Sequence, residues 1–369
     1  MPRAERVELR DFRNYERADV ELGEGLTVVT GPNGAGKTNL LEGLYFALTG
    51  RSCRTSSERE TVRYGAPAAR AVARTRDAEG DPHTLEVGYE PGEPKRMRID
   101  GSAFEGVPNP ELRPLVNVFM PDRLALVKGA PSVRRAHLDQ LAATLWPARA
   151  GERAAYARAL AQRNAALARV RAGAAPPSLL DPWDAELARI GVELMRARAE
   201  ASELLGPSFV ARAAELGLPS ADLGYRPRSA ADDAAELRAE LLERRGSDLG
   251  RGFTGHGPHR DDLALRHEGR ALRAYGSQGQ QRVGLLALLF AERDVMLERG
   301  RPPLMLLDDV ASELDADRRE RLAALVRAGG QVVISATEVE HVPGGDDGGV
   351  ARVEVESGRL ASRPRLAAA

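Results

Sequence analysis

The stretch that decides the fold is Gly31-Pro32-Asn33-Gly34-Ala35-Gly36-Lys37-Thr38, which matches the pattern Gly-x-x-x-x-Gly-Lys-Thr. A short apolar run at residues 26–30 precedes it, and apolar residues at helical spacing follow it over residues 40–48. A strand, a glycine loop and a helix in this order form the phosphate-binding loop of nucleotide-binding proteins. The glycines let backbone N–H groups surround the phosphates, and the start of the helix adds partial positive charge. We therefore predict an ATP site here.

Two side chains of this loop have chemical roles of their own. Lys37 should bridge the β- and γ-phosphates and assist catalysis, and the hydroxyl of Thr38 should bind Mg²⁺. A compact ammonium suits this position, where a planar guanidinium does not substitute well. The backbones of the other residues should contact the phosphates: Gly31, Pro32, Asn33, Gly34, Ala35 and Gly36. The alternative interpretation is a glycine-rich turn before a helix.

A pair of carboxylates, Asp308 and Asp309, lies 270 residues after Thr38 and directly follows the apolar run at residues 304–307. At the end of a buried strand, Asp308 would hold Mg²⁺ through water. Asp309 would orient the attacking water and accept its proton, which makes it the candidate catalytic base. The alternative is a solvated Asp-Asp turn.

The segment Ser277-Gln278-Gly279-Gln280-Gln281 opens a predicted helix. Ser277 suits the N-cap, and Gly279 would let a phosphate approach the helix start. The segment resembles the signature motif of ABC-type ATPases, which contacts the γ-phosphate of ATP held by the opposite subunit. By that resemblance Ser277, Gly279 and Gln280 are nucleotide-binding residues, and the protein forms an ATP-dependent homodimer. An ordinary capped helix is the alternative.

Two further segments occupy positions that such ATPases use. Ser312-Glu313-Leu314-Asp315 follows the Asp pair, where these proteins carry a loop that touches across the dimer. Thr337 follows the apolar run at residues 332–334, at the switch position. Many ABC ATPases have His there, so a role for Thr337 in sensing the γ-phosphate stays open beside a purely structural one.

Composition limits the classes of function. The chain has 369 residues, of which 43% are hydrophobic and 29% charged, with a formal net charge of −1. Any surface for nucleic acid must therefore be a local patch. Cys53 is the only cysteine, so an intrachain disulfide and a Cys-rich metal site are excluded, which suits a reducing cytoplasm. The chain has no run of 18 apolar residues, so we expect no membrane span.

Two stretches carry a local excess of arginine. Residues 149–171 contain six Arg against Glu152. Residues 51–76 contain seven Arg against two Glu, and we take these seven as candidate DNA contacts: Arg51, Arg54, Arg59, Arg63, Arg70, Arg74 and Arg76. Arginine patches contact phosphates without reading sequence. A solvated charged face is the alternative for each stretch.

The pattern along the chain predicts an α/β ABC-type ATPase head, with a phosphate loop and a mixed sheet, that is interrupted by a helical lobe. Residues 1–125 and 248–369 should form the head, and residues 126–247 the helical insertion. No sustained heptad run is present, so we expect no long coiled coil. In the C-terminal part we expect a helix over 280–298, a buried strand over 304–307, a helix over 316–327 and a strand over 331–335.

Taken together, these motifs resemble the RecF family, bacterial recombination-mediator ATPases related to SMC proteins. The matching residues are spread over most of the chain. They are Leu-Arg-Asp-Phe-Arg-Asn-Tyr (9–15), the phosphate loop with Asn-Leu-Leu-Glu (39–42), Phe-Met-Pro-Asp (119–122), Leu-Ala-Leu-Val-Lys-Gly (124–129), Arg-Arg (134–135), Leu-Asp (138–139), Gln-Arg-Asn (162–164), Gly-Pro-His-Arg-Asp-Asp (257–262), Ser-Gln-Gly-Gln-Gln-Arg (277–282) and Asp-Asp-Val-Ala-Ser-Glu-Leu-Asp (308–315).

The resemblance implies an ATP-dependent dimer with weak, DNA-stimulated ATPase activity. It further implies binding to double-stranded DNA, a preference for junctions beside single-stranded gaps, and cooperation with RecR and RecO in loading RecA. Two other classes remain as alternatives: the ATPase subunit of a transporter, and a scaffold in which ATP is bound but not hydrolysed.

Overall fold

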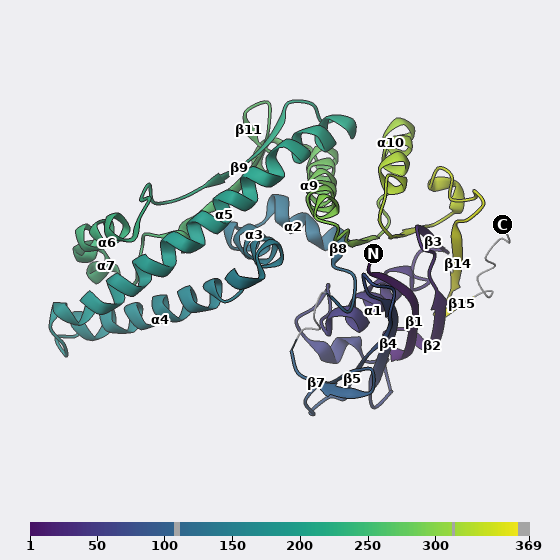
Figure 1. Ribbon diagram of the computed structural model, residues 1–369, viewed down its shortest axis with the longest axis horizontal. Coiled ribbons are helices and arrows are strands. Elements are labelled where there is room, and N and C mark those ends of the chain that lie inside the picture. Colours follow the sequence, from purple (N-terminus) through teal and green to yellow (C-terminus); the bar gives the residue numbers. More distant parts are fainter. Residues whose placement is uncertain (107–110, 312–313, 361–369) are drawn as a thin grey trace. The chain divides into compact units, whose positions relative to one another are not determined.

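The computed structural model describes residues 1–106, 111–311 and 314–360. The chain divides into two compact units (Figure 1). We call the first the head (Met1–Arg123, Glu215–Gly217 and Leu285–Ala369) and the second the arm (Leu124–Ala214 and Leu218–Gly284). Across the described ranges, every helix is too short or too polar to span a lipid bilayer.

A largely parallel sheet forms the centre of the head. Its strands, in spatial order, are β15 (Arg359–Leu360), β14 (Ala351–Glu356), β3 (Leu26–Thr30), β13 (Val332–Ala336), β12 (Leu304–Leu307) and β8 (Val116–Phe119). Only β15 pairs antiparallel. All four residues of β12 are buried, as expected for a strand covered on both faces. Strands β3, β12 and β13 lie where the sequence predicted them, with a shift of one residue for β13.

A second, antiparallel sheet lies in the same unit. Its strands, in spatial order, are β2 (Tyr15–Glu21), β1 (Arg3–Phe12), β4 (Ala69–Arg76), β5 (Pro82–Tyr89), β6 (Arg96–Ile99) and β7 (Ser102–Phe104). In β1, Val7, Leu9 and Phe12 are buried and belong to the apolar core of the head. A short helix, η1 (Glu58–Thr61), precedes β4.

Helix α1 (Lys37–Thr49) packs against both sheets and shares one apolar core with them. Its approach to β1 is close, because a Cβ at Gly43 would lie 2.6 Å from Leu9 Cδ1. Gly50 ends the helix in the left-handed conformation, which glycine adopts readily at this position. The head also contains α10 (Ala316–Arg327), η6 (Val339–His341) and most of α9 (Gln278–Glu298).

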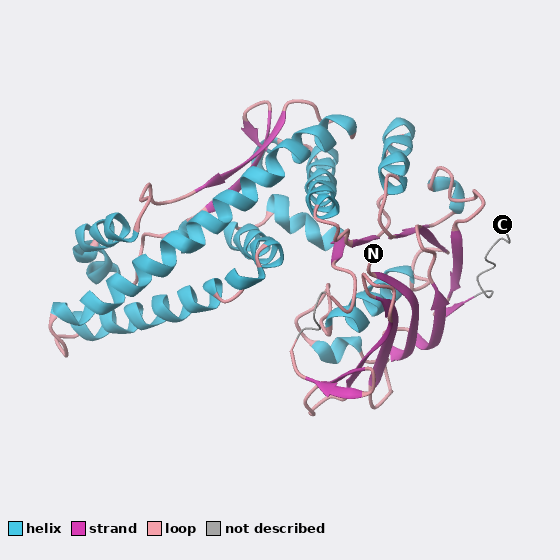
Figure 2. Cartoon of the chain, viewed as in Figure 1, coloured by secondary structure: helices cyan, strands magenta, loops and turns pink. Residues whose placement is uncertain are grey.

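The arm is mainly helical, and Figure 2 shows it in cyan around a few short strands. Its longest helix, α5 (Asp181–Glu215), spans 35 residues and packs against α4 (Glu152–Arg171). No long coiled coil occurs in the described residues, which confirms that prediction. The other helices of the arm are α2 (Ala125–Lys128), α3 (Pro131–Leu145), η3 (Pro147–Arg149), η4 (Pro177–Leu180), α6 (Ala234–Glu243), α7 (Arg245–Arg251), η5 (Pro258–Arg260) and α8 (Leu272–Tyr275). The short helix η2 (Pro121–Leu124) spans the boundary, and three of its four residues belong to the head.

The boundary between the two units differs from the prediction at its second crossing. Residues 248–284, which we expected in the head, group with the arm. The reason is a small sheet, in which β10 (Asp262–His267) pairs with β9 (Ala221–Arg226) on one side and β11 (Arg270–Ala271) on the other. Arg134 Nε also donates to Asp262 Oδ1 at 2.7 Å. Pairing between distant segments therefore carries this stretch into the arm.

Candidate nucleotide-binding site

The predicted phosphate loop lies between the end of β3 and the start of α1. Two of its glycines are required by their surroundings. A Cβ on Gly31, whose φ is +147°, would lie 2.1 Å from the carbonyl oxygen of Val355. A Cβ on Gly36, whose φ is +121°, would lie 2.6 Å from Asn14 Nδ2. Any side chain at these positions would displace the loop, so the glycine spacing is a packing requirement as well as a motif.

Residues of the first hairpin brace the loop from behind. The Tyr15 hydroxyl donates to the carbonyl of Gly36 at 3.0 Å, and Asn14 Nδ2 donates to the carbonyl of Ala35 at 3.0 Å. Tyr15 is fully buried, and burial raises the pKa of its phenol well above the usual range. The sequence alone did not predict these two bonds, because nothing local indicates a contact across 21 residues.

Lys37 is buried, and its ammonium lies against the loop. Lys37 Nζ donates to the carbonyl of Gly31 at 2.7 Å and to that of Pro32 at 3.1 Å. Gly36 occupies the N-cap of α1, and no side chain caps the helix. A buried ammonium beside an uncapped helix start suits an anion, because both place positive charge toward the same loop.

The structure brings Asp308 to Thr38, although 270 residues separate them. Thr38 Oγ1 donates to Asp308 Oδ2 at 2.8 Å, and Ser335 Oγ donates to Asp308 Oδ1 at 2.7 Å. The sheet order explains this, because β13 lies between β3 and β12 and all three run parallel. Their carboxyl ends therefore meet at one edge, where ligands of α/β sheets bind.

Burial raises the pKa of Asp308, and the nearby charge of Asp309 adds to this, whereas the bonds from Ser335 and Thr38 act in the opposite direction. Only 4% of Asp308 is exposed. The Asp308 carboxylate and the Thr38 hydroxyl offer oxygen ligands in a buried place. Oxygen ligands of this kind suit a divalent cation such as Mg²⁺. These residues therefore fit Mg²⁺, and Ser335 is a supporting residue that sequence reasoning missed.

Asp309 adopts a left-handed conformation with φ of +49°. Its backbone N–H donates to Ser335 Oγ at 3.0 Å, so one serine fixes both aspartates. Non-glycine residues in this region are uncommon, although Asp tolerates it better than most. Such conformations concentrate at functional sites. This is compatible with the catalytic role predicted for Asp309.

Thr337 follows directly after β13, between the phosphate loop and the aspartates. Its carbonyl accepts from Gly31 N at 3.3 Å. Its hydroxyl lies 2.9 Å from Nδ1 of His341, at the end of η6. The sequence has Thr337 where many ABC ATPases have the switch histidine. In the folded chain, however, His341, four residues further on, lies beside Thr337.

The signature segment lies in the arm, at the first turn of α9. Ser277 Oγ accepts from Gln280 N at 3.2 Å, and Gln280 Oε1 accepts from Ser277 N at 2.8 Å. This reciprocal pair is a capping box, which confirms the predicted N-cap. A Cβ on Gly279 would meet nothing closer than Ser277 Oγ at 4.0 Å, so this glycine leaves open space. Contact of the segment with nucleotide stays a prediction.

The predicted dimer-contact loop is only partly described. Ser312 and Glu313 lie outside the described residues. Leu314 is buried, and Asp315 caps α10 by accepting from Arg318 N at 2.9 Å.

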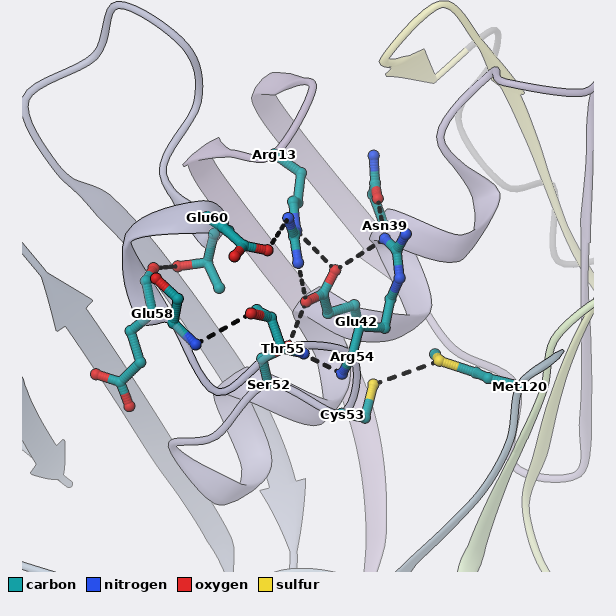
Figure 3. Close-up of polar contacts among 12 residues, drawn as sticks. Arg13, Asn39, Glu42, Ser52, Cys53, Arg54, Thr55, Glu58, Glu60 and Met120 are labelled. Carbon is teal, nitrogen blue, oxygen red and sulfur yellow. Dashed lines mark hydrogen bonds and ion pairs between the residues drawn. The ribbon is translucent and has the colours of Figure 1, made fainter. Parts of the chain in front are cut away.

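A buried carboxylate on α1 organises the segment that follows this helix, and Figure 3 shows it at the centre of a polar network. Glu42 is fully buried and accepts from Arg13 Nη2 at 2.7 Å and from Arg54 Nη1 at 3.2 Å. Arg54 also donates to Asn39 Oδ1 at 2.9 Å, and its charge helps to lower the pKa of Asp308. Arg54 therefore belongs to the surroundings of the nucleotide site.

The arginine-rich segment 51–76 is less basic in three dimensions than its sequence indicates. Most of its arginines pair with acids from other segments. The pairs are Arg54 with Glu42, Arg63 with Asp11, Arg70 with Glu86, Arg74 with Glu8 and Arg76 with Glu5. Among the described residues, only Arg51 and Arg59 of the seven lack such a partner. The net charge counted along this segment therefore overstates its charge in the fold, because the acidic partners come from other segments.

The second arginine-rich stretch needs a similar correction. Arg163 is fully buried and bonds two aspartates, so it is no part of a surface. Arg149 pairs with Glu200 at 2.7 Å. Whether either stretch contacts DNA stays a prediction.

Comparison with known proteins identifies the family of the chain. Residues 6–88 match the family model described as an AAA domain. The chain is 40% identical to the DNA replication and repair protein RecF of Streptomyces avermitilis, over 92% of this chain and 94% of the relative. It is also 40% identical to the RecF protein of an Anaeromyxobacter species, over 87% and 88% of the two chains.

Solved structures agree. The structure of the recombination mediator protein RecF-ATP in the RecFOR pathway has a TM-score of 0.83 to this chain, with 27% identity and 97% of both chains covered. A Smc head domain from Pyrococcus furiosus matches with a TM-score of 0.60 and 17% identity, over 99% of this chain and 96% of that one, which shows a shared fold.

The fold is therefore that of an ABC-type ATPase head of the kind found in SMC proteins, with a phosphate loop and an Asp-bearing strand at one sheet edge. Within that class, the chain belongs to the RecF family of DNA replication and repair proteins.

Proposed function

We propose that the protein is an ATP-gated clamp for DNA. ATP would bind between two copies of the chain, held by Lys37 and Thr38 of one copy and by Ser277 of the other. The observation that carries the proposal is the bond between Thr38 and the buried Asp308 at 2.8 Å, which assembles one half of a Mg²⁺-nucleotide site. The open space over Gly279 at a capped helix start supports the second half.

DNA is the partner that the relatives favour, because they are named as DNA replication and repair proteins. Binding of two nucleotides would close the dimer over double-stranded DNA, with a preference for junctions between duplex and single-stranded gaps. RecR and RecO are the proposed protein partners in loading RecA, as the RecFOR pathway of the solved relatives suggests. Such work on the chromosome would take place in the cytoplasm.

The residues of the head divide the work. Lys37 binds the β- and γ-phosphates, and Thr38 with Asp308 would hold Mg²⁺, which neutralises charge that develops on the phosphates. Asp309 orients the attacking water and accepts its proton. Hydrolysis is weak and opens the dimer, so ATP binding, more than turnover, sets the DNA-bound state.

The test is the oligomeric state under defined ligands. Light scattering after size-exclusion chromatography would be run with ATP, with ADP and without nucleotide, each with and without duplex DNA. We expect dimers only with ATP. Lys37→Met should abolish them, whereas Lys95→Met, which removes a surface partner of Glu58, should not. Normal ATP-dependent dimers of Lys37→Met would show that the loop has another role.

Turnover separates this proposal from the ATP-binding scaffold. The clamp should hydrolyse ATP slowly, and faster with duplex DNA present. A protein that binds ATP and dimerises but shows no turnover above that of Asp309→Asn would be a scaffold.

A further inference from the structure

A hollow on the arm has no part in the nucleotide site. Its volume is about 380 Å³, and it is lined by Arg228, Arg251, Phe253, Gly255 and Arg260. These residues come from four places that the chain brings together: the turn after β9, the end of α7, the loop that leads into η5, and the end of η5. No acidic side chain lines the hollow.

The three guanidinium groups lack acidic partners. Arg228, Arg251 and Arg260 are exposed, and none forms an ion pair within the described part of the chain. Two carboxylates, those of Asp248 and Asp261, bond the backbone of lining residues, and each already pairs with an arginine outside the hollow. Asp248 bonds Arg163 and the backbone of Gly255. Asp261 accepts from the backbone N–H of Arg228 at 2.7 Å and from Arg198 at 3.1 Å. The hollow is therefore a concave site of uncompensated positive charge.

An exposed aromatic ring completes the hollow. Phe253 is 42% exposed, and the guanidinium of Arg260 lies 5.4 Å from its ring centroid. The adjoining residues hold the loop in place. Thr254 N donates to Asn164 Oδ1 at 2.8 Å, and Gly255 N donates to Asp248 Oδ1 at 2.9 Å. A ring on a loop that is already ordered loses little entropy when a ligand binds.

We propose that this hollow binds single-stranded DNA, with phosphates on the arginines and a base stacked on Phe253. A guanidinium group can donate two parallel hydrogen bonds to the oxygens of one phosphate. Every base can stack its π-face on an aromatic ring. The choice of DNA as polymer rests on the proposed function, and the site gives that function a place for the unpaired strand beside a duplex.

The combination of features favours a single strand over two other ligands. The bases of a duplex are stacked and paired, so they cannot enter a concave pocket and reach Phe253. An acidic peptide could use the arginines, but its carboxylates would leave the exposed ring without a partner. Of these three ligands, the unpaired strand alone supplies both an anion and an accessible aromatic face.

The test is binding of a fluorescent oligothymidylate of about 12 nucleotides, a length within the range that single-strand sites cover, followed by anisotropy without ATP. Phe253→Ala should weaken binding about tenfold while the slope of log K against log salt stays unchanged, because stacking involves no counterion. Arg251→Gln should weaken binding and reduce that slope by about 0.7, the contribution of one phosphate contact in a single strand. Phe253→Tyr should restore binding.

Arg238→Gln is the matched control. Arg238 is an exposed arginine on α6 that lies outside both arginine-rich stretches and does not line the hollow, so its loss should change affinity by less than about twofold. Equal losses in Arg238→Gln and Arg251→Gln would overturn the proposal, as would failure of the wild type to bind the oligonucleotide. Binding of an oligo-glutamate peptide that needs Arg251, without binding of oligothymidylate, would identify an acidic protein partner and also overturn it.

ATP-dependent binding of a blunt duplex, measured on the same variants, distinguishes this inference from the proposed function. We expect duplex affinity within about twofold of wild type in Phe253→Ala. If the wild type binds single strands through Phe253 but never binds duplex with ATP, the clamp fails and the pocket stands. If duplex binding falls with Phe253→Ala while single-strand binding persists, the pocket proposal is wrong.

Discussion

The polar core of the arm and the nucleotide site of the head both contain buried aspartates, but the partners of these aspartates differ. In the arm, Arg163 is fully buried and bonds Asp184 at 2.6 Å, Asp248 at 2.7 Å and Thr254 at 2.8 Å. In the head, Asp308 is buried with hydroxyl partners, and burial raises its pKa. Arg245 also pairs with Asp184, so paired buried charges hold the elements of the arm together, whereas a buried carboxylate whose hydrogen-bond partners are hydroxyls suits a site that binds a cation.

The Gly-Pro-His-Arg-Asp-Asp motif at residues 257–262 also contains buried polar side chains that bond other parts of the arm. His259 Nδ1 accepts from the Tyr156 hydroxyl at 2.9 Å, and Nε2 donates to the carbonyl of Thr254 at 2.9 Å. Asp261 accepts from the Tyr225 hydroxyl and from Arg198, which also bonds Asp139 at 2.7 Å. Through His259 and Asp261 the motif therefore ties α3, α4 and α5 to β9 and β10, a structural role that is separate from the one proposed above for Arg260.

The largest expected effect comes from breaking the balance in the arm. Arg163→Met leaves Asp184 and Asp248 buried without their common partner, which should cost about 3–5 kcal/mol of the arm's free energy of unfolding. The two tryptophans of the chain, Trp146 and Trp183, both belong to the arm, so their fluorescence in urea reports this unit. Arg158→Met, on the exposed side of α4, should change stability by less than about 0.5 kcal/mol.

Binding of a fluorescent ATP analogue to Arg163→Met, measured below the urea midpoint, sharpens the comparison. We expect it to remain close to wild type, because Lys37, Thr38 and Asp308 all belong to the head. Loss of nucleotide binding together with arm stability would show that the two regions are not energetically separate.

Asp308→Asn should have the next largest effect, and in the opposite sense for stability. Loss of the Mg²⁺ carboxylate should lower ATP hydrolysis by about 100-fold or more. Since burial raises the pKa of Asp308 above its value in the unfolded chain, ionisation opposes folding, and the nucleotide-free variant should gain about 1 kcal/mol at neutral pH. Urea titrations without Mg²⁺ should show this gain shrinking as pH falls and Asp308 takes up its proton.

Asp309→Asn is the matched variant at the same strand end. It should slow hydrolysis while ATP-dependent dimers persist, because the cation site remains. If it loses ATP binding instead, the assignment of Asp309 as the base is wrong.

A smaller effect should follow from acid. Burial lowers the pKa of His259 to about 4, from an ordinary value of 6.5. The neutral ring is the form that the arm holds, so its stabilising contribution is complete above about pH 6.5 and is lost as pH falls toward about 4. Tryptophan fluorescence in urea should show this loss over that window, by about 3 kcal/mol. His259→Gln should be less stable at neutral pH and should lack most of this pH dependence; an unchanged profile would mean that another group titrates.

The nucleotide site was largely predictable from sequence because its signals are local. The glycine loop at residues 31–38 and the apolar run before Asp308 each identify one strand end, and parallel packing brings those ends together. The supporting bonds of Asn14, Tyr15 and Ser335 were not predictable, since each depends on which distant segment becomes a neighbour. The position of the arm boundary was not predictable for the same reason. It depends on the pairing of β9 with β10, which 35 residues separate, and nothing in the sequence between them indicates that the two strands pair.

The smallest effects should come from substituting arginines of segment 51–76. This segment contains both arginines that pair with acids and arginines that do not, so the two kinds can be compared directly. Arg70 pairs with Glu86 at 2.8 Å on the surface of the antiparallel sheet, and Arg59 has no acidic partner in the described chain. Arg70→Gln should change stability by less than about 1 kcal/mol, as for other exposed pairs, and should leave duplex affinity nearly unchanged. If segment 51–76 contacts DNA, Arg59→Gln should instead reduce the salt slope of ATP-dependent duplex binding by about 0.9, the value of one phosphate contact. Equal slopes for the two variants would mean that ion pairing within the fold does not decide which arginines meet DNA.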